Sequence, residues 1–179
     1  FIDSNLEHFG SYQDVFNKKH DNMFHSILSS SINIGLINPN DIIERLRKVE
    51  KSAPMNSLEG YVRQLCWREF QRYCYIYYND LASKNFFTLT NRIDDDVWYN
   101  GSTNILPIDN CIRKAIDTAY LHHIERLMIV GNFMVLSEIS PQEGHRWFME
   151  FAIDSYEWVM LQNVYDMVFH NGNGLTSYK

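Results

Sequence analysis

An all-α fold is predicted by three features of this 179-residue sequence. Apolar residues recur with the helical period nearly throughout, and no stretch of strand length alternates apolar and polar residues. Only 8 Gly and 4 Pro are spread along the chain, which leaves little material for flexible linkers. With 45% hydrophobic residues the chain can bury one core, so we expect a single domain over residues 1–179.

The apolar period predicts the helices one after another along the chain. They are expected at 11–18, 23–35, 40–52, 57–79, 108–118, 119–137, 141–153 and 154–165. The pattern is interrupted between about 80 and 107, where we expect one long irregular loop. Loops of this length inside a domain are usually functional or mobile.

Two of these helices have clear start signals. "NSLE" predicts an N-cap at Asn56 with Glu59 three residues later. "SPQE" predicts a cap at Ser140, Pro141 in the first turn and Glu143 closing a capping box.

Charge and cysteine content exclude several classes of protein. A net charge of −6 argues against a protein whose whole surface attracts nucleic acid. A local basic groove is still compatible with this charge. No apolar run approaches the roughly 18 residues that a membrane span needs, so no membrane partner is expected. The odd cysteine count without C-x-x-C spacing argues against a disulfide framework and a four-cysteine zinc site. We expect buried, reduced thiols in an intracellular protein of the cytoplasm or nucleus, at Cys66, Cys74 and Cys111.

The stretch "FHSILSSSINIGLINP" places a run of serines at an expected helix start. Serine hydroxyls there can cap the free N–H groups of the helix, and those N–H groups can instead hold a phosphate. Spacing alone favours the cap, and the anion site is the alternative.

Three expected helices contain residues whose side chains could bind a ligand or take part in a reaction. Tyr61, Gln64 and Arg68 fall at i, i+3 and i+7 on one face, with Trp67 at its edge. Without other information, an amphipathic helix with solvent-reaching Arg and Gln is the favoured explanation.

The other two segments lie later in the chain. His122 and Arg126 are four residues apart, and His123 is turned about 100° from His122, so the pair is a poor zinc site. Asp154 is a single acid among aromatic residues that include Trp147. Such a carboxylate must find a hydrogen-bond donor, because burying an unpaired charge is costly.

Five segments, in order, resemble the photolyase and cryptochrome superfamily: "HFGSYQD", "FHSILSSSINIGLINP", "NSLEGYVRQLCWREF", "YLHHIERLMIVGNF" and "SYEWVMLQNVYDM". The resemblance is to the flavin-binding helical region of the photolyase-related branch, which includes bacterial (6-4) photolyases. It implies an all-helical FAD-binding domain, as a fragment without the preceding α/β antenna domain and without the C-terminal helices.

The resemblance also implies roles for individual residues. "HSILS" is similar to the family's T-S-x-L-S phosphate loop, with His25 in place of Thr, and on this ground the anion site overtakes the cap. FAD-binding positions are implied at Tyr12, His25, Ser26, Leu28, Ser29, Tyr61, Gln64, Arg68, His122, Arg126, Asp154 and Met160. Met160 stands where many relatives place Asn or an acid near flavin N5. Catalytic positions are implied at His123 as proton donor, Trp67 beside a flipped-out base and Trp147 as first aromatic of the electron path.

The activity implied is light-driven repair of pyrimidine dimers in damaged DNA, by electron transfer from reduced FAD to the lesion. Leu127 replaces the second histidine of the (6-4) enzymes, and the tail "HNGNGLTSYK" departs from the family's Gly-Gly loop. Cys111 has roughly the neighbourhood of a first cluster ligand, but we expect no iron–sulfur cluster within these residues. Two alternatives stay open: a cryptochrome-like photosensor without repair activity, and a non-catalytic fragment that pairs with a separately encoded remainder of the photolyase.

Overall fold

The computed structural model describes residues 1–172, except for the side chain of Asn79. These residues form helices and turns without a β-strand, and two isolated bridges join Asn17 to His20 and Asn91 to Ile139. This confirms the predicted all-α class. The chain divides into two compact units at Phe70 and Gln71, and each is described by itself. The single domain over residues 1–179 stays a prediction.

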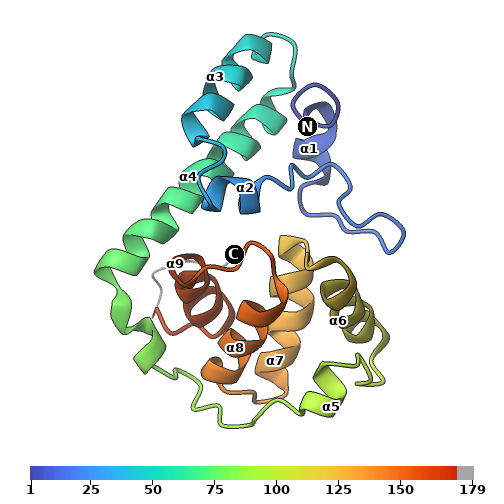
Figure 1. Cartoon of the computed structure of the whole chain (residues 1–179), viewed down its shortest axis with the longest axis vertical. Helices are drawn as coiled ribbons and strands as arrows, with labels where there is room; N and C mark the ends of the chain where they lie inside the picture. Colours follow the sequence, from blue (N-terminus) through green and yellow to red (C-terminus); the bar gives the residue numbers. More distant parts are fainter. Residues whose placement is uncertain (173–179) are drawn as a thin grey trace. The chain divides into compact units, whose positions relative to one another are not determined.

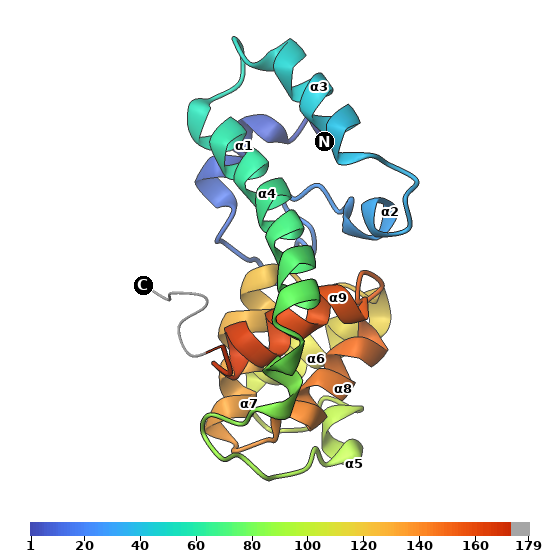
Figure 2. The ribbon, with the colours of Figure 1, turned by 90° about the vertical axis from the view of Figure 1, so that its left-hand side faces the viewer.

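The first unit contains three short helices and the beginning of a long one. They are α1 (Leu6–Tyr12), α2 (Ser29–Asn33), α3 (Pro39–Val49) and the first part of α4 (Met55–Tyr77). Figure 1 and Figure 2 show α1 and α3 beside the first part of α4. Their apolar faces form one core from Leu6, Phe9, Ile32, Ile42, Leu46, Leu58, Tyr61 and Leu65.

Close approach of α1 to α4 depends on Gly10. The Gly10 N–H donates to the Ser57 hydroxyl at 2.9 Å, and that hydroxyl donates to the Glu7 carbonyl at 3.3 Å. A Cβ atom at Gly10 would lie 2.5 Å from the backbone of Asn56 and Ser57. Only glycine allows this approach, because backbone atoms cannot move aside as a flexible side chain can.

The second unit contains the rest of α4 and a series of short helical segments around one core. In chain order they are η1 (Asn79–Ser83), α5 (Asp95–Trp98), α6 (Leu106–Thr118), η2 (Glu125–Gly131), α7 (Asn132–Leu136), α8 (Pro141–Phe151), α9 (Glu157–Met160) and η3 (Leu161–Val168). Both η2 and η3 are π-helices, and Gly131 of η2 packs against Val168 of η3. The buried core includes Ile112, Val130, Met134, Trp147, Phe148, Val164 and Phe169.

Several predicted helix bounds are wrong, and local backbone conformation gives the reason. The predicted helices at 11–18 and 23–35 are replaced by α1, which ends at Tyr12, and by α2, which begins at Ser29. Met23 and Ile27 have φ angles of +41° and +48°, which no right-handed helix accommodates. Likewise Ala119, with φ of +54°, ends α6, so the predicted helix 119–137 begins later.

One of the two predicted N-caps is confirmed. The Ser140 hydroxyl accepts from the Glu143 N–H at 3.3 Å, with Pro141 at the first position of α8. The Glu143 carboxylate does not close the box, because it accepts from the Ile93 N–H at 3.2 Å. The Asn56 cap is wrong, because α4 already begins at Met55.

The stretch 80–107 is mostly exposed, but a few of its apolar residues attach it to the core. It contains part of η1 and all of α5, and Leu89, Ile93 and Trp98 from it are buried in the core of the second unit. Asn85 closes a turn there, since its side chain donates to the Leu89 carbonyl at 2.7 Å and accepts from the Leu89 N–H at 2.9 Å.

The cysteines are free thiols, as predicted, and Cys74 and Cys111 are buried. Cys66 is exposed, contrary to the prediction. Its neighbour Leu65 is on the buried face of α4, and Cys66, one residue later, is on the face that meets solvent. No helix of the described residues is long and apolar enough to cross a membrane. The tail "HNGNGLTSYK", which departs from the Gly-Gly loop of the resembled family, lies mostly in residues 173–179, outside the described part of the chain.

Candidate functional site

In the first unit, the segment before α2 is attached to α4 through Tyr61 and Ser26. The two side chains form a hydrogen bond, and the Tyr61 side chain is almost fully buried. Burial raises the pKa of Tyr61, while the bond to Ser26 acts in the opposite direction. The Tyr61 ring packs on Phe1 and Phe9 with centroid separations of 4.7 and 5.5 Å. Tyr61 is therefore a neutral phenol that holds Ser26 against the helix.

The ring of His25 faces two backbone carbonyl groups. Its Nδ1 lies 3.1 Å from the Asn22 oxygen and its Nε2 lies 3.1 Å from the Gln13 oxygen. The ring also meets the edge of Phe9 at a centroid separation of 5.9 Å. His25 thus joins the end of α1 to the segment that leads into α2.

The serine run lies inside α2 and not before it. The N-cap residue is Leu28, whose side chain has no polar atom, and Ser29 is the first helical residue. The capping interpretation is therefore wrong for these serines. Leu28 packs against the core of the first unit.

The three residues that share a face of α4 have different surroundings. Tyr61 points into the core, Gln64 is exposed, and Arg68 is mostly buried. The Arg68 guanidinium donates to Asn33 of α2 at 3.3 Å and to Glu69 at 2.5 Å. This places a cation beside the end of α2.

Two further predicted residues of this unit are aromatic. Tyr12 is partly exposed and its ring lies 5.2 Å from that of Phe24. Trp67 is half-buried and packs on Phe70 at 4.9 Å. Both rings keep a surface on which a planar group could stack.

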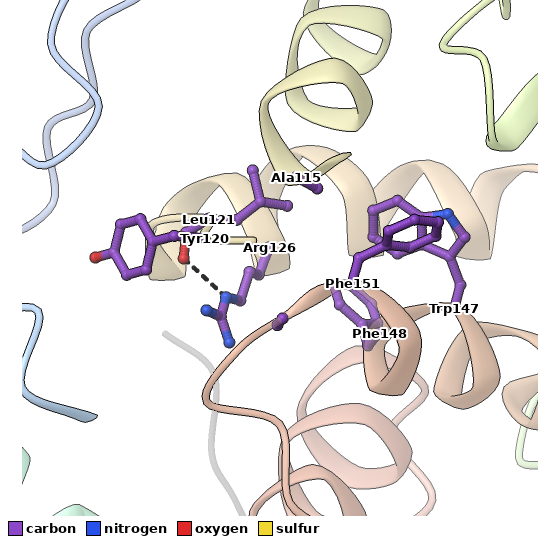
Figure 3. A pocket seen from close by; sticks show the side chains of 8 residues that line it. Ala115, Tyr120, Leu121, Arg126, Trp147, Phe148 and Phe151 are labelled. Atoms are coloured by element: carbon purple, nitrogen blue, oxygen red, sulfur yellow. Dashed lines mark hydrogen bonds between the residues drawn. The ribbon is translucent and has the colours of Figure 1, made fainter. Parts of the chain in front are cut away.

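In the second unit, Arg126 and Asp154 form an ion pair. The Arg126 Nη2 donates to Asp154 Oδ1 at 2.8 Å, and the two side chains are 17% and 13% exposed. Arg126 Nε donates to the Leu121 carbonyl at 2.8 Å, the bond drawn in Figure 3. The hydrogen-bond donor that a carboxylate among aromatic residues is expected to need is therefore present, and Arg126 supplies it.

An apolar pocket lies beside this ion pair. Figure 3 shows the Arg126 guanidinium at one side and the rings of Trp147, Phe148 and Phe151 at the other. Trp147 is 1% exposed, and its ring lies 5.3 Å from Phe148 and 5.2 Å from Phe151. Of the charged pair only Arg126 lines the pocket, together with the aromatic wall, and the remaining lining residues are Ala115, Tyr120, Leu121 and Ala152.

The adjacent histidines have different surroundings, as the predicted 100° offset requires. His122 is buried, and its Nδ1 accepts from the Ile124 N–H at 3.0 Å, so the hydrogen of the neutral ring is on Nε2. His123 is exposed. No group of three or more potential metal-ligating side chains occurs in the described residues. Met160, predicted near the flavin ring, is buried in the core.

Sequence reasoning missed a buried pair in this region. Glu125 is 5% exposed and accepts from Lys114 Nζ at 2.8 Å and from the His122 N–H at 2.9 Å. A carboxylate three residues after His122, within an apolar helix, is the signal that could have indicated it.

The structure therefore brings some predicted residues together in pairs. Ser26 meets Tyr61 in the first unit, and Arg126 meets Asp154 in the second. Hydroxyl and guanidinium groups in the first unit suit a phosphate-bearing ligand. The charged pair beside aromatic rings in the second suits a planar ring with polar edges. Taken unit by unit, these groups are chemically compatible with a phosphate in the first unit and with a planar ring in the second, and FAD contains both.

The comparisons with known proteins agree. The family of the FAD binding domain of DNA photolyase matches residues 61–172. A (6-4) photolyase of Agrobacterium fabrum is 40% identical over 171 residues, which are 93% of this chain and 34% of that protein. The deoxyribodipyrimidine photo-lyase of Escherichia coli is 29% identical over 143 residues, 72% of this chain and 29% of that protein.

A solved structure has the same fold. The crystal structure of a bacterial class III photolyase from Agrobacterium tumefaciens superposes with a TM-score of 0.81 at 23% identity, covering 93% of this chain and 35% of that chain. The fold is the helical one of that photolyase. This chain belongs to the FAD-binding domain family of the DNA photolyases. It spans about a third of the length of the two Agrobacterium photolyases.

Proposed function

We propose that this chain binds FAD and takes part in light-driven repair of pyrimidine dimers in damaged DNA. The observation that carries the proposal is the Arg126–Asp154 pair beside the aromatic pocket. The family of the chain and the photolyase relatives support it.

FAD, when bound, supplies light-driven electron transfer, which protein side chains alone do not provide. In this proposal Ser26 and Ser29 bind the pyrophosphate, and Tyr61 holds Ser26 in place. Arg126 orients Asp154, so that the carboxylate can accept hydrogen bonds from the cofactor. The further cofactor contacts proposed are Tyr12, Leu28, Gln64, Arg68, His122 and Met160.

Three residues serve the DNA lesion and the electron path in this proposal. His123 is exposed and can give a proton from a ring nitrogen near neutral pH. Trp67 stacks on the flipped-out base. Trp147, inside the aromatic wall, passes an electron inward.

The chain covers 34% of the Agrobacterium fabrum (6-4) photolyase and 35% of the solved class III photolyase. Damaged DNA and a separately encoded remainder of the photolyase are the proposed partners. The alternative functions are a photosensor and a non-catalytic fragment. One series of measurements distinguishes the proposed repair function from these two alternatives.

The experiment is the visible spectrum of the full chain with added FAD, before and after blue light with a reductant, followed by a dimer-cleavage assay. Retained flavin that bleaches, with dimer cleavage, supports the proposal. Retained flavin without cleavage favours the photosensor. No retained flavin at excess FAD overturns the proposal and favours the fragment. Asp154→Asn should weaken FAD binding, while Asp117→Asn on the exposed face of α6 is the matched control.

A further inference from the structure

The two bonds of the His25 ring require a particular form of that ring. Nδ1 faces the Asn22 carbonyl and Nε2 faces the Gln13 carbonyl, each at 3.1 Å. A carbonyl oxygen accepts hydrogen bonds and cannot donate them, and a neutral imidazole carries only one N–H. Both bonds therefore form together only when the ring is an imidazolium.

The His25 ring lies in a segment with unusual backbone conformation. On either side of His25, Met23 and Ile27 have positive φ angles, which L-residues adopt only when their surroundings hold them. Ser26 follows directly, and its side chain is bonded to Tyr61 of α4. The Gln13 carbonyl lies at the end of α1, so the ring closes the segment between α1 and α2 into a loop.

We infer that His25 is a positioning residue: its imidazolium clamps the carbonyl groups of Gln13 and Asn22, fixes Ser26 beside α4, and adds positive charge to the proposed phosphate site. The inference rests on the proposed binding of FAD for the identity of the ligand. The inferred role differs from the expected direct contact of His25 with FAD. Both ring nitrogens face backbone oxygens, so a phosphate would interact with the positive charge of the ring and would not accept a hydrogen bond from it.

Other charged groups belong to the elements around the ring. They are Glu7 and His8 on α1, and Asp14, Lys18, Lys19, His20 and Asp21 in the connecting segment. All of them are unchanged in the variants below, so comparison at one pH isolates the ring of His25.

The first test compares two ligands and two variants. His25→Gln is neutral and carries both of its N–H donors on one nitrogen, so it cannot face the two carbonyl groups from two ring positions, whereas His25→Arg keeps the charge and several donors. Riboflavin is the control ligand, because it shares the flavin ring and has no phosphate. His25→Gln should weaken FAD binding about tenfold, which corresponds to one charge-assisted hydrogen bond. Its affinity for riboflavin should change less than about twofold, and His25→Arg should recover most of the FAD affinity.

The inference is overturned if His25→Gln weakens FAD and riboflavin equally, or if His25→Arg binds FAD as weakly as His25→Gln. The first result would mean that His25 acts on the flavin ring. The second would mean that neither the charge nor the paired donors matter.

A second test needs no cofactor. At pH 6 the ligand-free chain should show imidazole N–H signals at both ring nitrogens of His25 that are protected from solvent exchange. The exposed His20 in the same segment should show none. His25→Gln should speed amide exchange across residues 13–26, and His25→Arg should restore the protection. An unprotected His25 ring with unchanged amide exchange overturns the clamp. If the wild-type chain binds no FAD, the proposed function fails, while this test still decides on the clamp.

Discussion

Arg126 donates a hydrogen bond of 2.8 Å to Asp154, 28 residues further along the chain, and both side chains are largely buried. Asp154→Asn would leave the guanidinium without its counter-charge in a poorly solvated position. We expect the free energy of unfolding to fall by roughly 3 kcal/mol. Urea denaturation measures it, with the exposed Asp117→Asn as control. A change of the same size in both variants would contradict the role of the pair.

The Tyr61–Ser26 bond should appear as a coupling between the two side chains. Tyr61→Phe and Ser26→Ala each remove one partner, and the double variant removes both. A double-mutant cycle in urea should give a coupling of about 1 kcal/mol, because one neutral hydrogen bond is lost in either single variant. Additive effects would show that the two groups do not interact in solution.

Ser140 should stabilise α8 as an N-cap. Ser140→Ala removes the acceptor for the Glu143 N–H, and we expect a loss of about 1 kcal/mol in stability. Ser102→Ala, at an exposed position, should change stability by less than about 0.5 kcal/mol. Thermal unfolding of the two variants gives the comparison, and equal melting temperatures would count against the cap.

Two glycines of the first unit should respond differently to alanine. Gly10→Ala places a Cβ atom 2.5 Å from the backbone of α4, and we expect a loss of several kcal/mol, on the order of 3. At Gly60 the nearest atom is the side-chain oxygen of Gln13 at 3.1 Å, which can shift. Because alanine favours a helix interior by about 1 kcal/mol over glycine, Gly60→Ala should have a much smaller effect. A Gly10→Ala variant as stable as the wild type would refute the close approach.

The thiols should differ in reactivity. Burial raises the pKa of Cys111 to about 12 and that of Cys74 to about 11, and the nearby carboxylates of Glu125 and Asp166 contribute in the same direction. Only the thiolate is nucleophilic, so at pH 8 a thiol reagent should modify Cys66 alone in the folded chain and all three cysteines in denaturant.

The same raised pKa values predict loss of stability at alkaline pH. Above about pH 9, the ordinary value for these thiols, the unfolded chain releases protons that the folded chain retains. The free energy of unfolding should therefore decline as the pH rises from about 9 towards 12. Cys111→Ala should reduce this decline, and a decline of unchanged slope would assign it to other groups.

The sequence predicts the helical class, the Ser140 cap and the need of Asp154 for a hydrogen-bond donor, because each depends on local pattern or on the cost of burying a charge. It does not predict the end of α1 at Tyr12, since the positive φ angles of Met23 and Ile27 occur in residues that usually avoid them. The sequence also does not predict the hydrogen-bond partners of His25. Both partners are backbone carbonyl groups, which every residue has, so no residue type marks them. The roles assigned to the site residues through the family resemblance stay predictions.

The π-helical form of η3 has a consequence for length variation in this family. A π-turn contains one residue more than an α-turn, so the backbone of Leu161–Val168 has the form that a one-residue insertion into an α-helix produces. Deleting one residue there would restore the α-helical form and leave the residues after it on their present faces, because the π-turn takes up the extra residue locally. Alignments across this segment should therefore carry a one-residue gap between π and α versions.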